Sequence, residues 1–533
     1  MNTKKPRMFR SAFHVSIMIF LSRIFGMVRN IFIASFFGTT GAASALQVAI
    51  QIPYMFRRIL GESALDAFFV PVYTSYAQEG DKEKTDGFIS NVINVIGSLI
   101  LVIIAIGWLI MPVIIFLQAA GLKSSSPEDF NYAVSLARIT LPFMFFISMM
   151  ALFMGLMNAN RNFVIPASNS LVLNILFIGV LLFFGSRVAH VYALGYQVAY
   201  AYIYGGFLIF FYQFIYIRKK YDFHYRFRFN PKGEGISRIF KMMLPAIGSM
   251  AVVHINIMVD TLLASFISPG TISVIRYAET IIQFPIGVIG VAVFNTALPS
   301  LSASVKKKDT VQSASVFRRL VHFILLIGVP VSVGLFAIRH DFVTFLYQYK
   351  NFSAADTMAV VHVLQFYIIG IIGFFGVRIV STLFYASEEI HIPFKVGMAA
   401  MGLNIVLNLI LMQFMGAAGL ALASSIAALA NITVLLIIVN RKYFPVDWRK
   451  CVETLIKALA AAVVMYFAVI RAGRFFEGNS FIERLFGVLI PVLAGVVVYF
   501  IALAILRPPG ADNLFAVLKK RFKKDGSDKD SPA

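Results

Sequence analysis

Residues 92–117 read VINVIGSLILVIIAIGWLIMPVIIFL and contain no charged side chain. A helix needs about 20 apolar residues to cross a hydrocarbon core roughly 30 Å thick, and this segment is longer than that. A second apolar segment, VLIPVLAGVVVYFIALAIL, occupies residues 488–506. Because lipid offers a backbone no hydrogen-bond partner, both segments are predicted to be transmembrane helices.

The composition of the whole chain agrees with this prediction. Of its 533 residues, 59% are hydrophobic and 14% are charged, whereas soluble proteins carry roughly 25% charged residues. Cutting the sequence at charged, Gly/Pro-rich or Asn/Ser-rich breaks predicts an all-α integral membrane protein with about fourteen spans. The predicted spans are 11–36, 43–77, 87–118, 132–157, 164–184, 190–217, 238–265, 271–300, 314–338, 355–386, 391–413, 416–441, 450–471 and 481–506. The first predicted span follows the basic segment MNTKKPRMFR, as the apolar part of a signal peptide would. No small-residue cleavage site follows its end, so we expect a retained helix and not a signal peptide.

The distribution of basic residues predicts the topology. With the N-terminus inside, most of the 47 Lys and Arg fall in cytoplasmic segments and their flanks. The outer loops hold Lys123, Arg187, Arg339, Lys350, Arg471 and Arg474. The positive-inside rule therefore places both termini in the cytoplasm. The net charge of +22 is explained by topology and contact with anionic membrane lipids, and no fold that would present it to nucleic acid accompanies it.

Two halves of the chain resemble each other at an offset of roughly 230 residues. IASFFGTTG at 33–41 is echoed by LASFISPGT at 263–271. An offset of six helices keeps both halves the same way up, which predicts two six-helix lobes related by a pseudo-two-fold axis along the membrane normal. The predicted domains are an N-lobe (1–217), a cytoplasmic linker (218–237), a C-lobe (238–441), a helix pair (442–507) and a basic cytoplasmic tail (508–533).

Charged residues inside the predicted spans are candidates for function, because a charge at the bilayer centre costs several kcal/mol. They concentrate in equivalent helix pairs of the two repeats. These residues are Arg23, Arg29, Arg57, Arg58, Glu62 and Asp66 in the first half, and Asp260, Arg276 and Glu279 in the second. Guanidinium groups facing a cavity suit a phosphate or pyrophosphate, since each presents planar, permanently charged donors.

A structural explanation competes with anion binding. Arg58 and Glu62 are spaced i,i+4 and could form an internal ion pair, with Asp66 balancing another arginine. Arg23 and Arg29 are six residues apart, which places them about 120° from each other on a straight helix. Both can face one cavity only if the helix bends, and Gly26 between them makes bending easier.

A second polar group could bind a small cation. It comprises Asp260, Asn404, Asn408 and Ser424. Hard oxygen donors of this kind suit Na⁺ better than a transition metal. The alternative is that the Asn side chains hydrogen-bond to neighbouring helices. The single cysteine, Cys451, excludes an intramolecular disulfide and a cysteine metal cluster.

The signatures of ATP hydrolysis and of common hydrolases are absent from the sequence. It contains no G-x-x-x-x-G-K-[ST] loop, no G-x-S-x-G elbow and no H-E-x-x-H pair. Arginines without an adjacent nucleophile indicate binding and movement of an anion. We therefore predict a transporter and not an enzyme.

Four segments resemble the MurJ (MviN) family of lipid II flippases. They are SRIFGMVRN (22–30), IPYMFRRILGESALDAFFVPVYTSY (52–76), QFPIGVIGVAVFNTALPSLS (283–302) and LYQYKNFSAADT (346–357). The resemblance extends over nearly the whole chain, including the fourteen predicted helices. It implies a fold of the MOP superfamily, alternating access, and lipid II as the cargo for peptidoglycan synthesis.

By position, the resemblance implies that Arg23, Arg29 and Arg57 hold the pyrophosphate of the cargo and that Glu62 is the acidic residue of the second helix. The chain departs from the family at two positions. Ser44 stands where the family has an acidic residue, and Thr280 stands where it has an arginine. Arg276 lies one turn before Thr280 on the same helix face and is predicted to replace that arginine, unless Glu279 holds it in a local ion pair.

Alternative functions on the same fold are a flippase for another polyprenyl-pyrophosphate glycan, such as an O-antigen unit, and a multidrug exporter. Arginines in the cleft argue against the exporter, because they would repel a cationic drug. A scaffold for cell-wall enzymes would not need charges inside the membrane. The sequence therefore favours a monomeric flippase that moves undecaprenyl-pyrophosphate-linked lipid II from the inner to the outer leaflet, without a cofactor other than the Na⁺ considered above.

Overall fold

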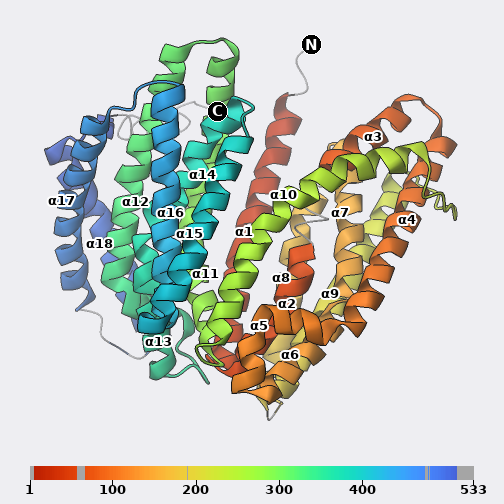
Figure 1. Ribbon diagram of the computed structural model, residues 1–533, viewed down its shortest axis with the longest axis horizontal. Helices are drawn as coiled ribbons and strands as arrows, with labels where there is room; N and C mark the ends of the chain where they lie inside the picture. Colours follow the sequence, from red (N-terminus) through yellow and green to blue (C-terminus); the bar gives the residue numbers. More distant parts are fainter. Residues whose placement is uncertain (1–4, 57–65, 189, 475–477, 479, 513–533) are drawn as a thin grey trace, which may run out of the picture. The chain divides into compact units, whose positions relative to one another are not determined.

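The computed structural model describes residues 5–56, 66–188, 190–474, 478 and 480–512 (Figure 1). Its regular elements in these ranges are all α-helices, as predicted. The contacts divide the chain into two units. Unit 1 comprises Met1–Ser273 and Tyr349–Phe352, and unit 2 comprises Val274–Gln348 and Ser353–Ala533. This division records packing, whereas the predicted lobes rest on an internal repeat, so the lobe boundaries stay a prediction.

Unit 1 contains α1 (Lys5–Phe37), α2 (Gly41–Phe56), α3 (Asp66–Gln78), α4 (Lys82–Leu109), α5 (Met111–Ser125), α6 (Pro127–Thr140), α7 (Phe143–Ala159), α8 (Val164–Phe184), α9 (Val191–Lys220) and α10 (Glu234–Ser265). Unit 2 contains most of α11 (Thr271–Lys306) and the whole of α12 (Thr310–Tyr347), α13 (Ala354–Ile369), α14 (Ile371–Ala386), α15 (His391–Met415), α16 (Ala417–Lys442), α17 (Trp448–Gly473) and α18 (Phe481–Leu506).

Ten of the described helical segments are long and apolar enough to cross a membrane, or eleven if α13 and α14 count as one bent span. The predicted total of fourteen therefore stays a prediction. Predicted span 132–157 is divided between α6 and α7, which together still form one candidate span, Pro127–Ala159, and two further predicted spans are interrupted. Span 87–118 is divided at Ile110, because Pro112 lacks the N–H that would continue the helical hydrogen bonds. Span 355–386 bends by 44° at Gly370.

Side-chain caps fix several helix starts in the described chain. Asp81 accepts a hydrogen bond from the backbone N of Lys84 at the start of α4. Ser353 and Asp356 form a capping box on α13, and Ser480 and Glu483 form one on α18. Each cap satisfies backbone donors that have no partner within the helix, so these polar residues define where the helices begin.

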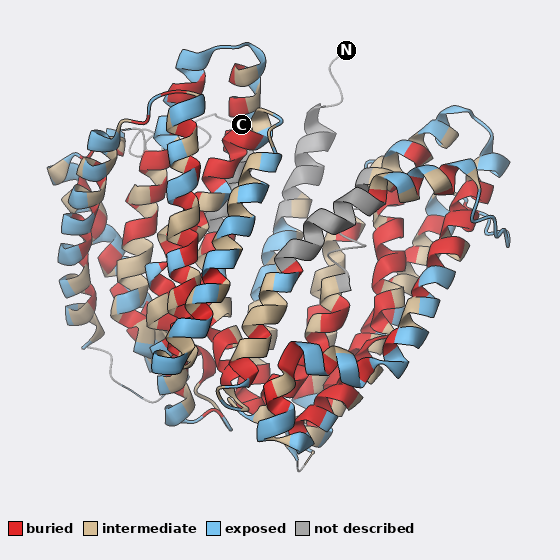
Figure 2. Ribbon diagram, in the orientation of Figure 1, coloured by how far each residue is buried: buried red, intermediate tan, exposed pale blue. Residues whose placement is uncertain are grey.

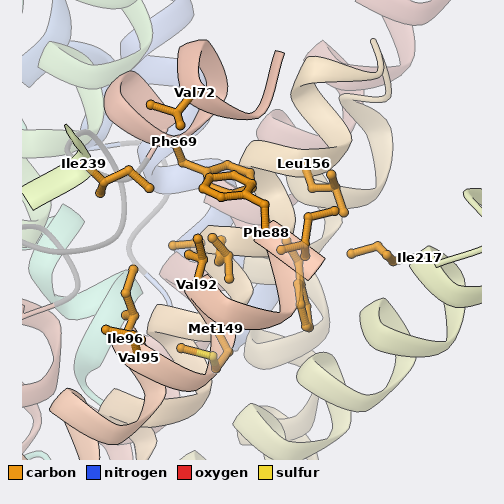
Figure 3. Close-up of a cluster of buried hydrophobic side chains, with 14 of the residues drawn as sticks. Phe69, Val72, Phe88, Val92, Val95, Ile96, Met149, Leu156, Ile217 and Ile239 are labelled. Atoms are coloured by element: carbon orange, nitrogen blue, oxygen red, sulfur yellow. The ribbon is translucent and has the colours of Figure 1, made fainter. Parts of the chain in front are cut away.

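The core of unit 1 is aromatic and aliphatic (Figure 3). Phe69 of α3 and Phe88 of α4 stack at 6.0 Å between ring centroids, and Tyr76 stacks on Phe88 at 4.4 Å. Met149 of α7 and Ile239 of α10 belong to the same buried cluster. This cluster joins α10 to α3, α4 and α7, so α10 is part of unit 1.

The segment that was predicted to link the lobes is attached to unit 1 along α4. Phe223 is buried in the core described above. Side chains of α4 bind successive backbone groups of residues 224–230. Asp86 accepts from the N of His224, Ser90 accepts from the N of Arg226, and Asn94 donates to the O of Arg228. Asn91 accepts from the N of Asn230 and donates to its O. We call residues 221–230 the strap, because they lie extended along one helix.

The helices of unit 2 are apolar on both their buried and their exposed faces. On α17, Ala458, Ala461 and Ala462 are buried against α12 and α18, and small residues of this kind allow helices to approach closely in lipid. Its exposed face carries Val452, Ile456, Leu459, Val463 and Phe467. Figure 2 shows exposed and buried residues alternating around α16 and α17. A helix that is hydrophobic all round belongs in a membrane, which agrees with the predicted class.

Candidate functional site

The predicted anion-binding residues of the first half divide into two groups. Arg23 and Arg29 lie on α1, inside the candidate membrane span Ile17–Phe37. Arg57, Arg58 and Glu62 lie outside the described residues. Among the predicted anion-binding residues of the first half, the structure therefore shows the surroundings of Arg23 and Arg29 only.

Arg29 lies in an aromatic environment made by three other helices. Its guanidinium carbon is 5.8 Å from the centroid of the Phe177 ring on α8. Tyr54 of α2 and Tyr202 of α9 are close enough to interact with it electrostatically. The two tyrosine rings meet edge to face at 6.0 Å, and Tyr202 packs on Phe177 at 4.2 Å. The face of the Phe177 ring stabilises the cation, and Arg29 is partly buried.

The sequence analysis did not identify these three aromatic residues. Phe177, Tyr54 and Tyr202 each lie in an apolar span, where an aromatic residue is ordinary, so spacing alone carries no signal that they meet at one arginine. Only the packing of α2, α8 and α9 brings them together.

Arg23 has different surroundings. Its side chain is exposed, and it makes no hydrogen bond or ion pair with the described residues. An arginine in the middle of a span costs about 2.5–3.5 kcal/mol even on the lenient insertion scale, and such residues almost always face water or a charged partner. The cost of its charge therefore keeps Arg23 a candidate for a functional residue.

Gly26, between the two arginines, has a packing role. A Cβ at this position would lie 3.3 Å from Nδ2 of Asn174 on α8. The same Nδ2 donates to the backbone O of Ser22 at 3.1 Å. The glycine thus lets a polar residue of α8 reach the backbone of α1, and the helix continues through it from Lys5 to Phe37. Asn174 is a polar residue inside an apolar segment. Such a residue often hydrogen-bonds to a neighbouring helix, so the sequence alone could have indicated this contact.

Arg276, in unit 2, forms the ion pair that was considered as an alternative. Its Nη1 donates to Oε2 of Glu279 at 2.9 Å, and both side chains are about three-quarters buried. The hydroxyl of Tyr367 on α13 donates to Oε1 of Glu279 at 3.4 Å. Thr280, where the family has an arginine, donates to the backbone O of Arg276. Glu279 thus offsets much of the charge that Arg276 could present to a ligand.

Ser44, the other departure from the family, is fully buried on α2. Its Oγ accepts a hydrogen bond from the backbone N of Ser273 at 3.2 Å. Ser273 lies in the first turn of α11, whose N–H groups have no partner within the helix. The serine therefore satisfies a helix end at this position, in place of the charge expected from the family.

Three of the four predicted cation ligands meet in unit 2. Nδ2 of Asn404 donates to Oγ of Ser424 at 3.3 Å, and Nδ2 of Asn408 donates to Oδ1 of Asn404 at 3.2 Å. Both asparagines are buried, as in the alternative of polar contacts between helices. Asp260, the only charged residue of the set, lies in unit 1, where Asn256 donates to it at 3.3 Å.

Comparisons with known proteins identify the fold and the family. The family model described as "Lipid II flippase MurJ" matches residues 33–487. A "Probable lipid II flippase MurJ" of Rickettsia prowazekii (strain Madrid E) is 30% identical over 428 residues, which cover 80% of this chain and 83% of the relative.

Two solved structures extend the comparison. The first, described as "Lipid II flippase MurJ, inward closed conformation", aligns with a TM-score of 0.76 and 28% identity over 92% of this chain and 98% of that chain. The second is an inward-facing multidrug resistance MATE family transporter of the MOP superfamily, which aligns with a TM-score of 0.63 over 79% of this chain and 94% of that chain. Its identity is 14%, so this likeness concerns the fold alone.

Proposed function

The chain belongs to the MurJ family of lipid II flippases, and from that premise we propose that it carries the undecaprenyl-pyrophosphate-linked peptidoglycan precursor from the inner to the outer leaflet by alternating access. As a member of this family it is a multi-pass membrane transporter and not an enzyme. The proposed pyrophosphate ligands are Arg23, Arg29, Arg57 and Arg276, with Glu62 as the acidic residue beside them. The proposed unit of transport is a monomer.

One observation supports the proposed site most strongly. Arg23 is an exposed, permanently charged side chain inside the candidate membrane span Ile17–Phe37, with no ion pair to a described residue. The free-energy cost of placing this charge inside the membrane is offset if the guanidinium binds a hydrated anion. A pyrophosphate offers several charged oxygen atoms, which arginine binds with two parallel hydrogen bonds.

The MATE-like fold alone does not make a drug exporter the better candidate. A cationic drug entering beside Arg23 and Arg29 would meet two positive charges in a medium of low dielectric constant. The same fold hosts different functions through its sites. The charge of this site therefore favours an anionic lipid over a cationic drug.

The transport proposal is tested by depleting the protein in its native bacterium and measuring which leaflet holds lipid II. We expect lipid II to accumulate in the inner leaflet and peptidoglycan synthesis to stop. Expression of the intact chain from a plasmid should restore both. Normal appearance of lipid II in the outer leaflet during depletion would contradict the proposal.

We propose that both termini and the strap are cytoplasmic, because only that orientation places the basic excess inside. After replacement of Cys451, a membrane-impermeant thiol reagent applied to whole cells should label a cysteine at Ser125 and spare one at Gly233. Permeabilised cells provide the control, because both positions should then react. Labelling of the cysteine at position 233 alone in intact cells would show that the topology is the opposite of the proposed one.

Arg276 allows a test that separates cargo binding from ion pairing. We expect Arg276→Thr to lower transport, and the combination with Thr280→Arg to restore it, because an arginine one turn along can reach the same region. Arg276→Thr with Glu279→Gln removes the pair without leaving an unpaired carboxylate. We expect this second combination to stay impaired. If it transports normally, Arg276 serves only to neutralise Glu279.

Na⁺ remains a proposed coupling ion at Asp260, Asn404, Asn408 and Ser424, a set of oxygen donors with one negative charge. Asp260→Asn should raise the Na⁺ concentration needed for half-maximal transport of lipid II between the leaflets of proteoliposomes. The variant Asn256→Ala, which keeps the carboxylate, is the control. An unchanged Na⁺ requirement in Asp260→Asn would contradict the proposal that Na⁺ binds at this site.

A further inference from the structure

The exposed face of α9 forms an apolar line that ends in a positive charge. Tyr204, Leu208 and Phe211 are exposed, and Ile215 and Lys219 follow at spacings of four residues. Residues three or four apart share one face of a helix, so these five side chains lie one above another. The line is apolar over several turns within the candidate span Val191–Lys220 and changes to lysine at its last turn.

A shallow hollow of about 350 Å³ lies at the charged end of this line, within unit 1. It is lined by Tyr212, Ile215, Tyr216, Lys219 and Lys220. All five residues belong to α9, so two lysines, two phenols and one aliphatic side chain line one side of this open space. The set combines cationic groups, hydroxyl groups and an apolar floor.

The polar groups of the hollow have capacity for an anion. Lys219 and Lys220 are exposed and form no ion pair within the described chain. The acidic residue nearest in sequence, Asp222, is bound by Lys82. Oη of Tyr216 accepts a hydrogen bond from Nδ2 of Asn162 at 2.6 Å, which leaves the phenolic hydrogen free to be donated. A ligand here would meet two ammonium groups and one hydroxyl donor.

The strap, which begins directly after α9, has the composition of a membrane–water boundary. Exposed Tyr225, Phe227 and Phe229 alternate with Arg226 and Arg228. Phe227 is 81% exposed, so no described part of the chain covers it. Aromatic and basic side chains concentrate where acyl chains meet headgroups. We therefore expect the charged end of α9 to lie at the depth of lipid phosphates, with the apolar line of α9 running into the bilayer.

We propose that this hollow is a binding site for an anionic phospholipid of the surrounding leaflet. Its phosphate lies between Lys219, Lys220 and the hydroxyl of Tyr216, and one acyl chain lies along Ile215, Phe211 and Leu208. Lysines act as point charges and suit a single phosphate, whereas the arginines of the proposed transport site suit a pyrophosphate. The site is independent of the proposed transport function and would hold a structural lipid at the end of α9.

Native mass spectrometry of the full-length protein, exchanged into micelles with equal amounts of phosphatidylglycerol and phosphatidylethanolamine, tests the proposal. We expect the wild-type protein to retain phosphatidylglycerol preferentially. Each lysine near a membrane surface contributes about fivefold to binding of anionic lipid, so Lys219→Gln with Lys220→Gln should weaken retention about 25-fold. The matched control is Lys306→Gln with Lys307→Gln, which removes the same charge from an exposed pair of lysines in unit 2.

Three results would overturn the proposal. One is equal retention of phosphatidylglycerol by the wild-type protein and the Lys219/Lys220 variant. Another is an equal loss in the Lys306/Lys307 control, which would show that net charge alone is sensed. The third is displacement of phosphatidylglycerol by inorganic phosphate or glycerol phosphate at equal concentration, because a site built for a lipid needs the acyl chain. Equal thermal unfolding temperatures of the three proteins would exclude misfolding as the cause of a loss.

Discussion

Arg23→Ala is expected to abolish growth of a flippase-depleted strain while the protein stays folded and inserted. The exposed guanidinium makes no hydrogen bond or ion pair with a described residue, so its removal breaks no internal polar contact there. The substitution removes the charge together with the flexible stem that carries it. The measurements are complementation, the membrane level of the variant by immunoblot, and its thermal unfolding temperature in detergent.

Controls separate the position of Arg23 from its charge. Arg187→Ala removes an exposed arginine that stacks on Phe183 at 3.9 Å outside the candidate spans, and it should complement normally. Arg23→Lys should restore growth only in part, because an ammonium group cannot form the bidentate contact. Full growth of Arg23→Ala at normal membrane level would remove Arg23 from the site.

Arg29→Ala is expected to behave differently from Arg23→Ala. It removes the contact with Phe177 and the hydrogen bonds to Oδ1 of Asn30. A cation–π contact contributes about 0.5–2 kcal/mol, depending on how far it is desolvated, and Arg29 is partly buried. The variant should therefore lose stability as well as transport, which thermal unfolding and complementation will show.

Gly121→Ala is expected to lower the stability of unit 1 strongly. A Cβ at Gly121 would lie 2.3 Å from the backbone C and O of Ser265 and 2.4 Å from the backbone N of Phe266. Backbone atoms cannot rotate away, so α5 and α10 must separate. The hydrogen bond from the N of Gly121 to Oγ of Ser265, at 3.0 Å, would then lengthen. Overpacking of this kind costs about 1–3 kcal/mol.

Thermal unfolding of the purified protein measures this effect, with Gly402→Ala as the matched control. Gly402 lies on α15, and no atom of the described chain lies within 4 Å of the position that a Cβ would take there. Alanine favours a helix over glycine by about 0.8–1 kcal/mol, so the control should unfold at the same or a slightly higher temperature. Equal unfolding temperatures of Gly121→Ala and the wild-type protein would show that α5 and α10 do not need this close approach.

The sequence alone was sufficient for the fold class, the family and the candidate charged residues. Lipid leaves a backbone no partner outside its own helix, so a long apolar segment such as residues 92–117 has only one structure open to it. The cost of a charge in lipid makes every arginine inside a span conspicuous. These conclusions depend on local composition, which is why Arg23 and Arg29 could be selected before any contact was known.

The tertiary structure decided what each selected residue touches. Arg23 and Arg29 look equivalent in sequence, yet Arg23 is exposed on α1 and Arg29 lies against Phe177. Arg276 is paired with Glu279, and Ser44 supports the start of α11. The strap lies in the segment that was predicted to be a cytoplasmic linker, and its backbone is bound along α4. Such contacts join residues far apart in the chain, and hydrophobic periodicity reports only which face of a helix is apolar and not which helix will meet it.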